Sequence, residues 1–341
     1  MQHANSLQNC IRSIPLPFNR RTIKLLIIVF LFARITQNLA AKDWSISVTP
    51  IFSVGFGTIG EYVYINTSSG KDIKLSELDW DVKPSLQYGG RVGVSWKALA
   101  VSGFAFGAVP MRSGAMKDSD WLTLTDLKTT YSVHENALAS SYSFGGRIAY
   151  TFKPLDFFSI SPFIGTDYVY ISMKARNGRG WNGYDKETGT GVSWDYPAVK
   201  QYRAGDIDYM REEVYTHTGI SFDIKINKFL FALSIALSPY TYMQSLDWHQ
   251  RKEQKNSYYI DIMHGWFSAY RFGTEVSYLF NKSISISLSL SWTFTRIIRG
   301  VSYDSDSLAG PWRKASDWGG EGGASRNTAE ISIGCTYRFL F

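Results

Sequence analysis

The chain has 341 residues, a formal net charge of +7, 19% charged residues and 16% aromatic residues. The charged fraction is below the ~25% of a typical soluble domain, and no segment approaches the ~18–20 continuous apolar residues of a membrane-spanning helix. These properties exclude a protein that crosses a membrane with several helices.

Residues 1–41 are predicted to be a secretory signal peptide. Basic residues precede the apolar run Leu25 to Ala33, and Asn38 to Ala41 offers a small-residue cleavage site. An uncleaved amphipathic anchor is the alternative. The 41 residues include five basic and no acidic ones, so the remainder carries 7 − 5 = +2. A nucleic-acid partner is therefore not expected.

From residue 42 onward the side chains alternate with a period of two, which predicts one all-β domain over 42–341. Turn signals divide this part into ten predicted strands. Tight turns near 97, 154, 227 and 281 alternate with longer connections, as in outer-membrane barrels, and an even number of strands places both termini inside the cell envelope. The glycine-rich segments 177–188 and 318–324 are expected in loops. The strands are expected at 44–65, 73–96, 98–112, 135–153, 156–176, 209–225, 229–249, 257–280, 282–303 and 326–341.

A lipid-facing barrel competes with a secreted β-sandwich, because both alternate polar and apolar residues. Serines at odd positions from Ser283 to Ser291 alternate with large apolar residues, and aromatic side chains gather near strand ends, as in interfacial girdles. The chain also ends on Phe341 after alternating aromatics, like the assembly signal of outer-membrane barrels. These features favour a ten-stranded antiparallel transmembrane β-barrel that extends beyond the outer membrane. Cys335, the one cysteine after residue 41, is expected to face lipid.

Two short polar motifs are expected at the outer end of this barrel. Asp118 and Asp120 open the second long loop, and Asp247 and His249 end the seventh strand. In extended chain, residues i and i+2 share a face. A histidine held in one tautomer by an aspartate can take a proton from water, so a water-activating site without a metal is conceivable. Solvated loop carboxylates are the alternative.

These motifs resemble those of the omptin family of outer-membrane endopeptidases. The segments Gly57 to Tyr64 and Leu75 to Trp80 are similar to the first omptin hairpin. Asp118-Ser119-Asp120-Trp121 is similar to the catalytic Asp-x-Asp-Trp motif of the family, and Asp247-Trp248-His249 is similar to its Asp-x-His motif. The resemblance implies that His249 is a general base oriented by Asp247. It also implies that Asp118 binds the nucleophilic water with His249, and that Asp120 supports Asp118. Water then attacks the scissile carbonyl directly.

The resemblance also implies a pocket for a basic residue before the scissile bond. Glu61 matches the acid at the bottom of that pocket, although a lumen glutamate with a structural role is the alternative. A second family acid lies two residues before the Asp of Asp-x-His, where this chain has Ser245. With one carboxylate instead of two, we expect the preference for Arg or Lys to weaken or change.

No cofactor is expected, and the lipid requirement of the family is in question. Where omptins have a key arginine for lipopolysaccharide, this chain has Tyr170, while Lys174, Arg176 and Arg211 lie near it off register. Activation by lipopolysaccharide is therefore expected to be absent or built differently. The expected partners are polypeptide substrates at the cell surface and outer-membrane lipid, and the chain is expected to be a monomer.

The seventh strand contains a conflict of parity. Phe231, Leu233 and Ile235 define its lipid face, yet Asp247 and His249 have the same odd parity. We therefore expect a bulge or sharp twist between residues 239 and 245. A weakly active or inactive adhesin of the same fold is the functional alternative. Structural roles are expected for Asp79 and Asp81, and loop or lumen positions for His134, His217 and His264.

Overall fold

The computed structural model describes residues 44–66, 72–250, 257–315 and 320–341. The predicted signal peptide, 1–41, lies outside the described residues. No helix in the described part of the chain is long and apolar enough to cross a membrane.

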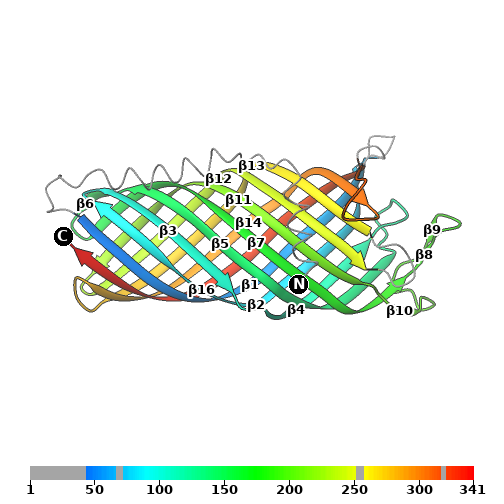
Figure 1. Cartoon of the computed structure of the whole chain (residues 1–341), viewed down its shortest axis with the longest axis horizontal. Coiled ribbons are helices and arrows are strands. Elements are labelled where there is room, and N and C mark those ends of the chain that lie inside the picture. Colours follow the sequence, from blue (N-terminus) through cyan, green and yellow to red (C-terminus); the bar gives the residue numbers. More distant parts are fainter. Residues whose placement is uncertain (1–43, 67–71, 251–256, 316–319) are drawn as a thin grey trace.

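Ten long antiparallel strands form a closed ring, in which a strand broken at Pro110 counts once (Figure 1). β1 pairs with both β2 and β16, and β5 pairs with β7, so the ring has no open edge between its long strands. This confirms the predicted ten-stranded barrel. The long strands are β1 (Trp44–Asn66), β2 (Asp72–Trp96), β3 (Leu99–Ala108) continued by β4 (Met111–Asp120), β5 (Thr130–Tyr150), β7 (Phe158–Asn182), β11 (Asp206–Ile226), β12 (Phe229–Gln250), β13 (Ser257–Leu279), β14 (Ile284–Ser305) and β16 (Gly320–Leu340).

Five short strands extend the ring or its loops. β6 (Phe152–Leu155), β10 (Gln201–Arg203) and β15 (Arg313–Lys314) pair with long strands, and β8 (Tyr184–Asp185) pairs with β9 (Thr190–Gly191). In Figure 1, β8, β9 and β10 lie at the end of the barrel opposite the C-terminus.

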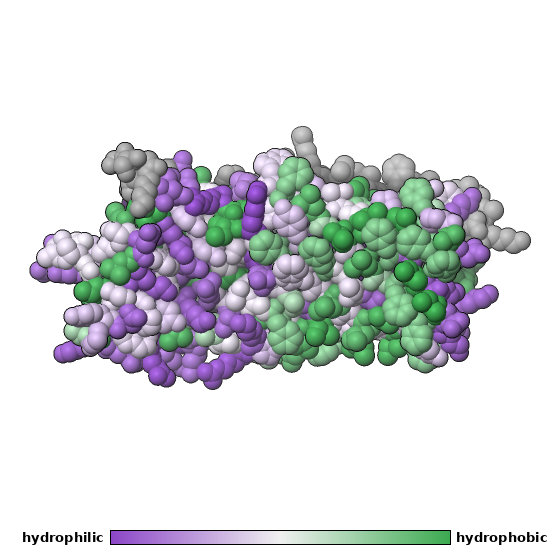
Figure 2. Space-filling model, turned by 180° about the vertical axis from the view of Figure 1, so that it is seen from behind, coloured by the Kyte–Doolittle hydropathy of each residue, from purple (hydrophilic) through white to green (hydrophobic). Residues whose placement is uncertain are grey.

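On the face shown in Figure 2, one half of the outer wall is an apolar belt and the other half is polar. On β1 the exposed apolar side chains end at Phe56, and on β12 they end at Ile235. The belt lies on the half that contains the C-terminal end of β16, where Ile331, Ile333 and Phe339 point outward as the alternation predicts. Cys335 is exposed on the same face, also as predicted. The strands therefore extend well past the belt on the loop side.

The predicted change of face in the seventh strand is confirmed. The pairing of β12 with β13 shifts between Ser238 and Tyr240, around Pro239. Before the shift odd-numbered residues such as Ile235 are exposed, and after it odd-numbered residues such as Met243 and Asp247 are buried. The bulge thus turns the Asp-x-His motif toward the barrel interior.

Several strands are longer than predicted on the loop side. Asp118 and Asp120 lie in β4 and not in a loop, and β5 already begins at Thr130. Gly178 and Gly180 lie in β7, and the described glycines of the second glycine-rich segment lie in β16, so the loop assignment was wrong for 177–182 and for 320–324. Residues 183 and 186–188 lie outside the strands, as predicted. Above the belt the outer face of a strand meets water and its inner face meets both polar and apolar side chains, so the apolar alternation that marks a strand disappears there.

A buried apolar cluster closes the barrel interior below its loop end. Trp80 of β2 and Tyr209 of β11 stack across it with ring centroids 5.2 Å apart, and Met116, Leu138 and Met173 pack around them. A separate cavity of about 560 Å³ lies in the lumen on the belt side, where His217 contacts Asp167. Val82, Leu138 and Ile171 of the cluster line this cavity, so the cavity borders the cluster directly.

Candidate active site

The Asp-x-His motif forms a hydrogen-bonded pair at the loop end of β12. His249 Nε2 lies 2.5 Å from Asp247 Oδ2, and the imidazole meets the ring of Tyr259 edge-on at 5.6 Å. The Asp247 carboxyl is buried, whereas the His249 side chain is 21% exposed. The aspartate thus fixes the ring and leaves part of it open to solvent, which suits proton exchange with water.

The Asp-x-Asp motif lies on the facing wall. Asp118 is the cross-strand partner of Leu78, and Asp247 is that of Tyr209. Because Tyr209 stacks on Trp80, two residues from Leu78, the walls that carry the motifs approach each other across the barrel. Asp118 and Asp120 share the parity of the buried Met116, so they belong to the interior face of β4. The structure therefore places both motifs on facing walls at the loop end of the barrel.

Glu61 lies between these walls. Its side chain is 3% exposed, five residues beyond the last belt residue of β1. Burial raises the pKa of Glu61 well above its usual value, and the charges of Asp247, Asp261 and Asp118 add to this shift, while Arg211 opposes it. The predicted pocket acid is thus close to both motifs.

Among the histidines, His134 is also at the loop end but differs from His249 in its surroundings. It is buried in β5, where Nε2 lies 2.8 Å from the Ser132 hydroxyl. Burial lowers the pKa of His134 to about 4, so this ring is neutral at pH 7. His217 is in the lumen as expected, but His264 lies on the outer wall beside Tyr240, which corrects its predicted position.

Other sequence predictions have clear outcomes. Asp81 has the expected structural role, since its carboxylate accepts from Lys83 Nζ and from the backbone N–H of Ala115. Tyr170 faces outward and stacks on Tyr142 with centroids 4.8 Å apart.

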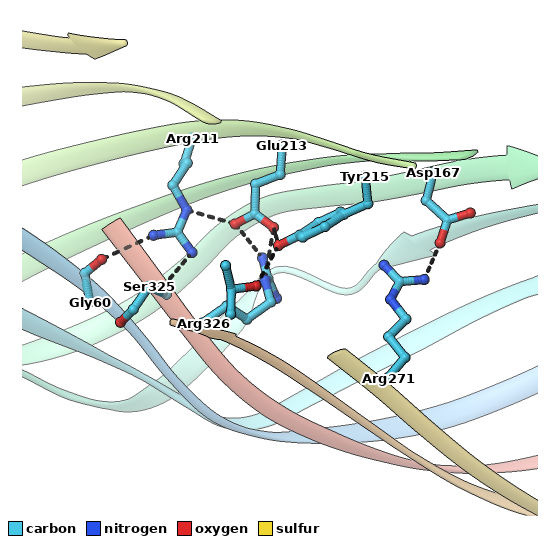
Figure 3. Close-up of polar contacts among 9 residues, drawn as sticks. Gly60, Asp167, Arg211, Glu213, Tyr215, Arg271, Ser325 and Arg326 are labelled. Atoms are coloured by element: carbon cyan, nitrogen blue, oxygen red, sulfur yellow. Dashed lines mark hydrogen bonds and ion pairs between the residues drawn. The ribbon is translucent and has the colours of Figure 1, made fainter. Parts of the chain in front are cut away.

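A buried ion network supports Glu61 from below. Arg211 donates to Glu213 at 2.6 Å and to the carbonyl oxygens of Gly60 and Ser325 at 3.1 and 3.0 Å. Figure 3 shows this arginine between β11 and the two strands β1 and β16. Arg211, which lies near position 170 in the sequence pattern, is fully buried. It therefore cannot contact lipid. It instead fixes the backbone next to Glu61.

Sequence comparison identifies the family. The sequence model of the Omptin family matches residues 44–339. The chain belongs to the omptin family. No curated protein sequence matches it. Membership of the family supports an outer-membrane protease, consistent with the belt and the interior site.

Solved structures agree with this omptin fold. The outer membrane protease OmpT from Escherichia coli superposes with a TM-score of 0.76 at 16% identity, over 89% of this chain and 100% of that one. The translocator domain of autotransporter NalP from Neisseria meningitidis has a TM-score of 0.36 at 6% identity, over 94% and 96% of the two chains. The match to OmpT shows a shared fold.

One acid of this omptin site was missed by sequence reasoning. Asp261 of β13 is 2% exposed and lies directly opposite Ser245 in the register of β12 and β13. A signal existed, because a symmetric hairpin around the predicted loop 250–256 pairs residues whose numbers sum to 506. That register places 261 opposite 245.

Proposed function

We propose that the chain is an endopeptidase of the outer membrane that cleaves exposed polypeptides near basic residues, with its site open to the cell exterior. The observation that carries the proposal is the hydrogen bond between His249 and Asp247 at an opening that also holds Asp118 and the buried Glu61. Family membership supports the same class of reaction.

The proposed reaction is direct attack by water. With the Nε2 proton of His249 directed at Asp247, Nδ1 is the nitrogen that accepts a proton from a water molecule held with Asp118 in the proposed reaction. The hydroxide forms a bond to the scissile carbonyl carbon, and the carbon–nitrogen bond then breaks. His249 returns the proton to the leaving amine, while Asp120 supports Asp118. No acyl-enzyme forms.

Glu61 is proposed to select the residue before the scissile bond. Its carboxyl is buried next to Asp247, and Oε2 has no hydrogen-bond partner among the described residues. A buried carboxylate without a partner is costly, and a substrate arginine or lysine supplies both the charge and the donors that it needs. Glu61 thus accounts for a basic preference.

The first test uses the full chain refolded in detergent and incubated with a mixed peptide library, read by mass spectrometry. We expect cuts after Arg or Lys, and loss of these cuts on Asp118→Ala. The matched control is Asp126→Ala, which removes an exposed carboxylate of the same loop end. Undiminished cleavage by folded Asp118→Ala contradicts the proposed site.

A parallel arm of this test adds lipopolysaccharide. Since Tyr170 stacks on Tyr142 and Arg211 is buried, we propose that activity does not require a lipopolysaccharide contact at these two positions. If the folded chain cleaves nothing with or without this lipid, the result favours the adhesin alternative.

A further inference from the structure

Ser245 occupies the position where the resemblance implies a second pocket acid, and a carboxylate lies directly beside it. Asp261 is its cross-strand partner on β13, and Ser245 Oγ donates to Asp261 Oδ2 at 3.4 Å. Both side chains are 2% exposed. The acid missing from β12 is therefore present one strand away, at the same height in the barrel.

Asp261 has the environment of a ligand-binding carboxylate. Its Oδ1 atom is buried and has no hydrogen-bond partner among the residues that the structure describes, and the same holds for Glu61 Oε2. The charge of Asp261 also acts on Glu61, whose pKa it raises. Two buried carboxyl groups with unpartnered oxygens thus share one part of the interior.

Small residues of β16 lie against both acids. A Cβ atom at Gly322 of β16 would overlap Asp261 Oδ1, so the carboxylate lies directly against this glycine. Glu61 pairs with Ala324, two residues further along β16. Asp261 and Glu61 therefore approach neighbouring positions of one strand, Gly322 and Ala324, which are both small residues.

Within residues 44–66, 72–250, 257–315 and 320–341, no ion pair joins Asp261 to a basic side chain. Arg211, which acts on Glu61, already donates to Glu213 and to two carbonyl oxygens. A buried carboxylate that is not paired within the protein is a strong attractor for an incoming cation.

We propose that Asp261 is a specificity-determining residue that supplies the second carboxylate for the basic side chain before the scissile bond, in place of the acid missing at Ser245. This proposal rests on the proposed protease function. Together with Glu61, Asp261 restores a two-acid pocket whose second acid enters from β13 and not from β12. We therefore expect the preference for Arg or Lys to be retained, and not weakened as the sequence alone suggested.

The test compares full-length wild type and Asp261→Asn on two peptides that differ only before the cut, one with arginine and one with its neutral isostere citrulline. We expect kcat/KM for the arginine peptide to fall about 10–100-fold in the variant, the range for a hydrogen bond to a charged group, while the citrulline peptide changes little. Glu321→Gln is the matched control, because it removes an exposed carboxylate next to Gly322.

A second variant separates a lost carboxylate from a damaged fold. The exchange Ser245→Asp with Asp261→Ser returns the acid to β12, and we expect it to recover most of the preference for arginine. If wild type cleaves but Asp261→Asn keeps the full arginine-to-citrulline ratio, the Asp261 proposal is overturned and the protease stands. If folded wild type cleaves neither peptide, the proposed function itself fails.

A pH profile provides an independent prediction. Burial raises the pKa of Asp261 to about 7. An ionised carboxylate binds the guanidinium and a protonated one does not, so kcat/KM for the arginine peptide rises as pH increases through about 7. The ratio of the arginine to the citrulline profile isolates ionisation of the two pocket acids, and Asp261→Asn removes the part that belongs to Asp261 while the part that belongs to Glu61 remains. A ratio that is flat with pH in wild type contradicts the role.

The groups that face Asp261 are Ser245 and Asp247 on β12, Ser302 on β14 and Glu61 on β1.

Discussion

Replacing His249 with alanine is expected to lower kcat for peptide hydrolysis by about 10²–10⁴-fold, the usual contribution of a positioned general base. Asp247, 2.5 Å from His249 Nε2, fixes the ring, and the proposed mechanism uses the other ring nitrogen as the base. Without the imidazole, water must attack while it still carries both protons. KM is expected to change little, because the pocket acids Glu61 and Asp261 remain. Steady-state kinetics on a single arginine peptide measure both quantities.

The control for this variant is His264→Ala. His264 is also a strand histidine, but it lies on the outer wall, where Nδ1 is 2.7 Å from the Tyr240 hydroxyl. We expect wild-type kcat from this variant in the same detergent. If His249→Ala retains more than about a tenth of wild-type kcat, the loss is smaller than a general base normally contributes, and the proposed mechanism is wrong.

The membrane half of the fold could be predicted because lipid imposes a strict pattern there. Each strand must place apolar side chains outward and small or polar ones inward, as the stretch before Ile235 and the one after Ile331 do. The conflict of parity in β12 was informative for the same reason. A catalytic pair on the lipid parity required a break in the pairing, and the structure has one at Pro239.

Beyond the belt lipid no longer dictates the alternation of side chains, and the predicted strand ends are wrong there. β4 extends to Asp120 and β7 extends to Asn182, although residues 113–120 and 177–182 had been predicted to lie in loops. These segments face water on one side and an interior with both polar and apolar side chains, such as Ser119 and Met116, on the other, so their strands show no regular apolar alternation. Backbone pairing with neighbours, such as Asp118 with Ser132 on β5, holds them in the sheet, and single-sequence patterns do not report such pairing.

Asp261 was missed for a related reason. A motif shows which residues share a face of one strand, but it does not show what the next strand places beside them. The position of Asp261 opposite Ser245 depends on the register of β12 and β13. Since residues directly opposite each other have neighbouring Cβ atoms, an acid can move between such positions while the charge of the pocket is kept.

The second large effect is expected on stability, from Glu213→Ala. Glu213 is fully buried and accepts from Arg211, from Arg326 at 2.8 and 2.9 Å, and from the Tyr215 hydroxyl at 2.6 Å (Figure 3). Its removal leaves two arginines in the interior without their shared counter-charge. Breaking a buried ion pair from one side costs about 3–5 kcal/mol of unfolding free energy, so we expect a loss of that size.

This loss is measured by urea unfolding of the refolded chain in detergent micelles, followed by tryptophan fluorescence, with Glu187→Ala in an exposed turn as the control. Because Arg211 also donates to the Gly60 and Ser325 carbonyls, the variant should weaken the support of Glu61 as well. KM for an arginine peptide is therefore expected to rise in whatever fraction remains folded. Equal unfolding midpoints for Glu213→Ala and Glu187→Ala would show that the network neither stabilises the barrel nor holds the pocket.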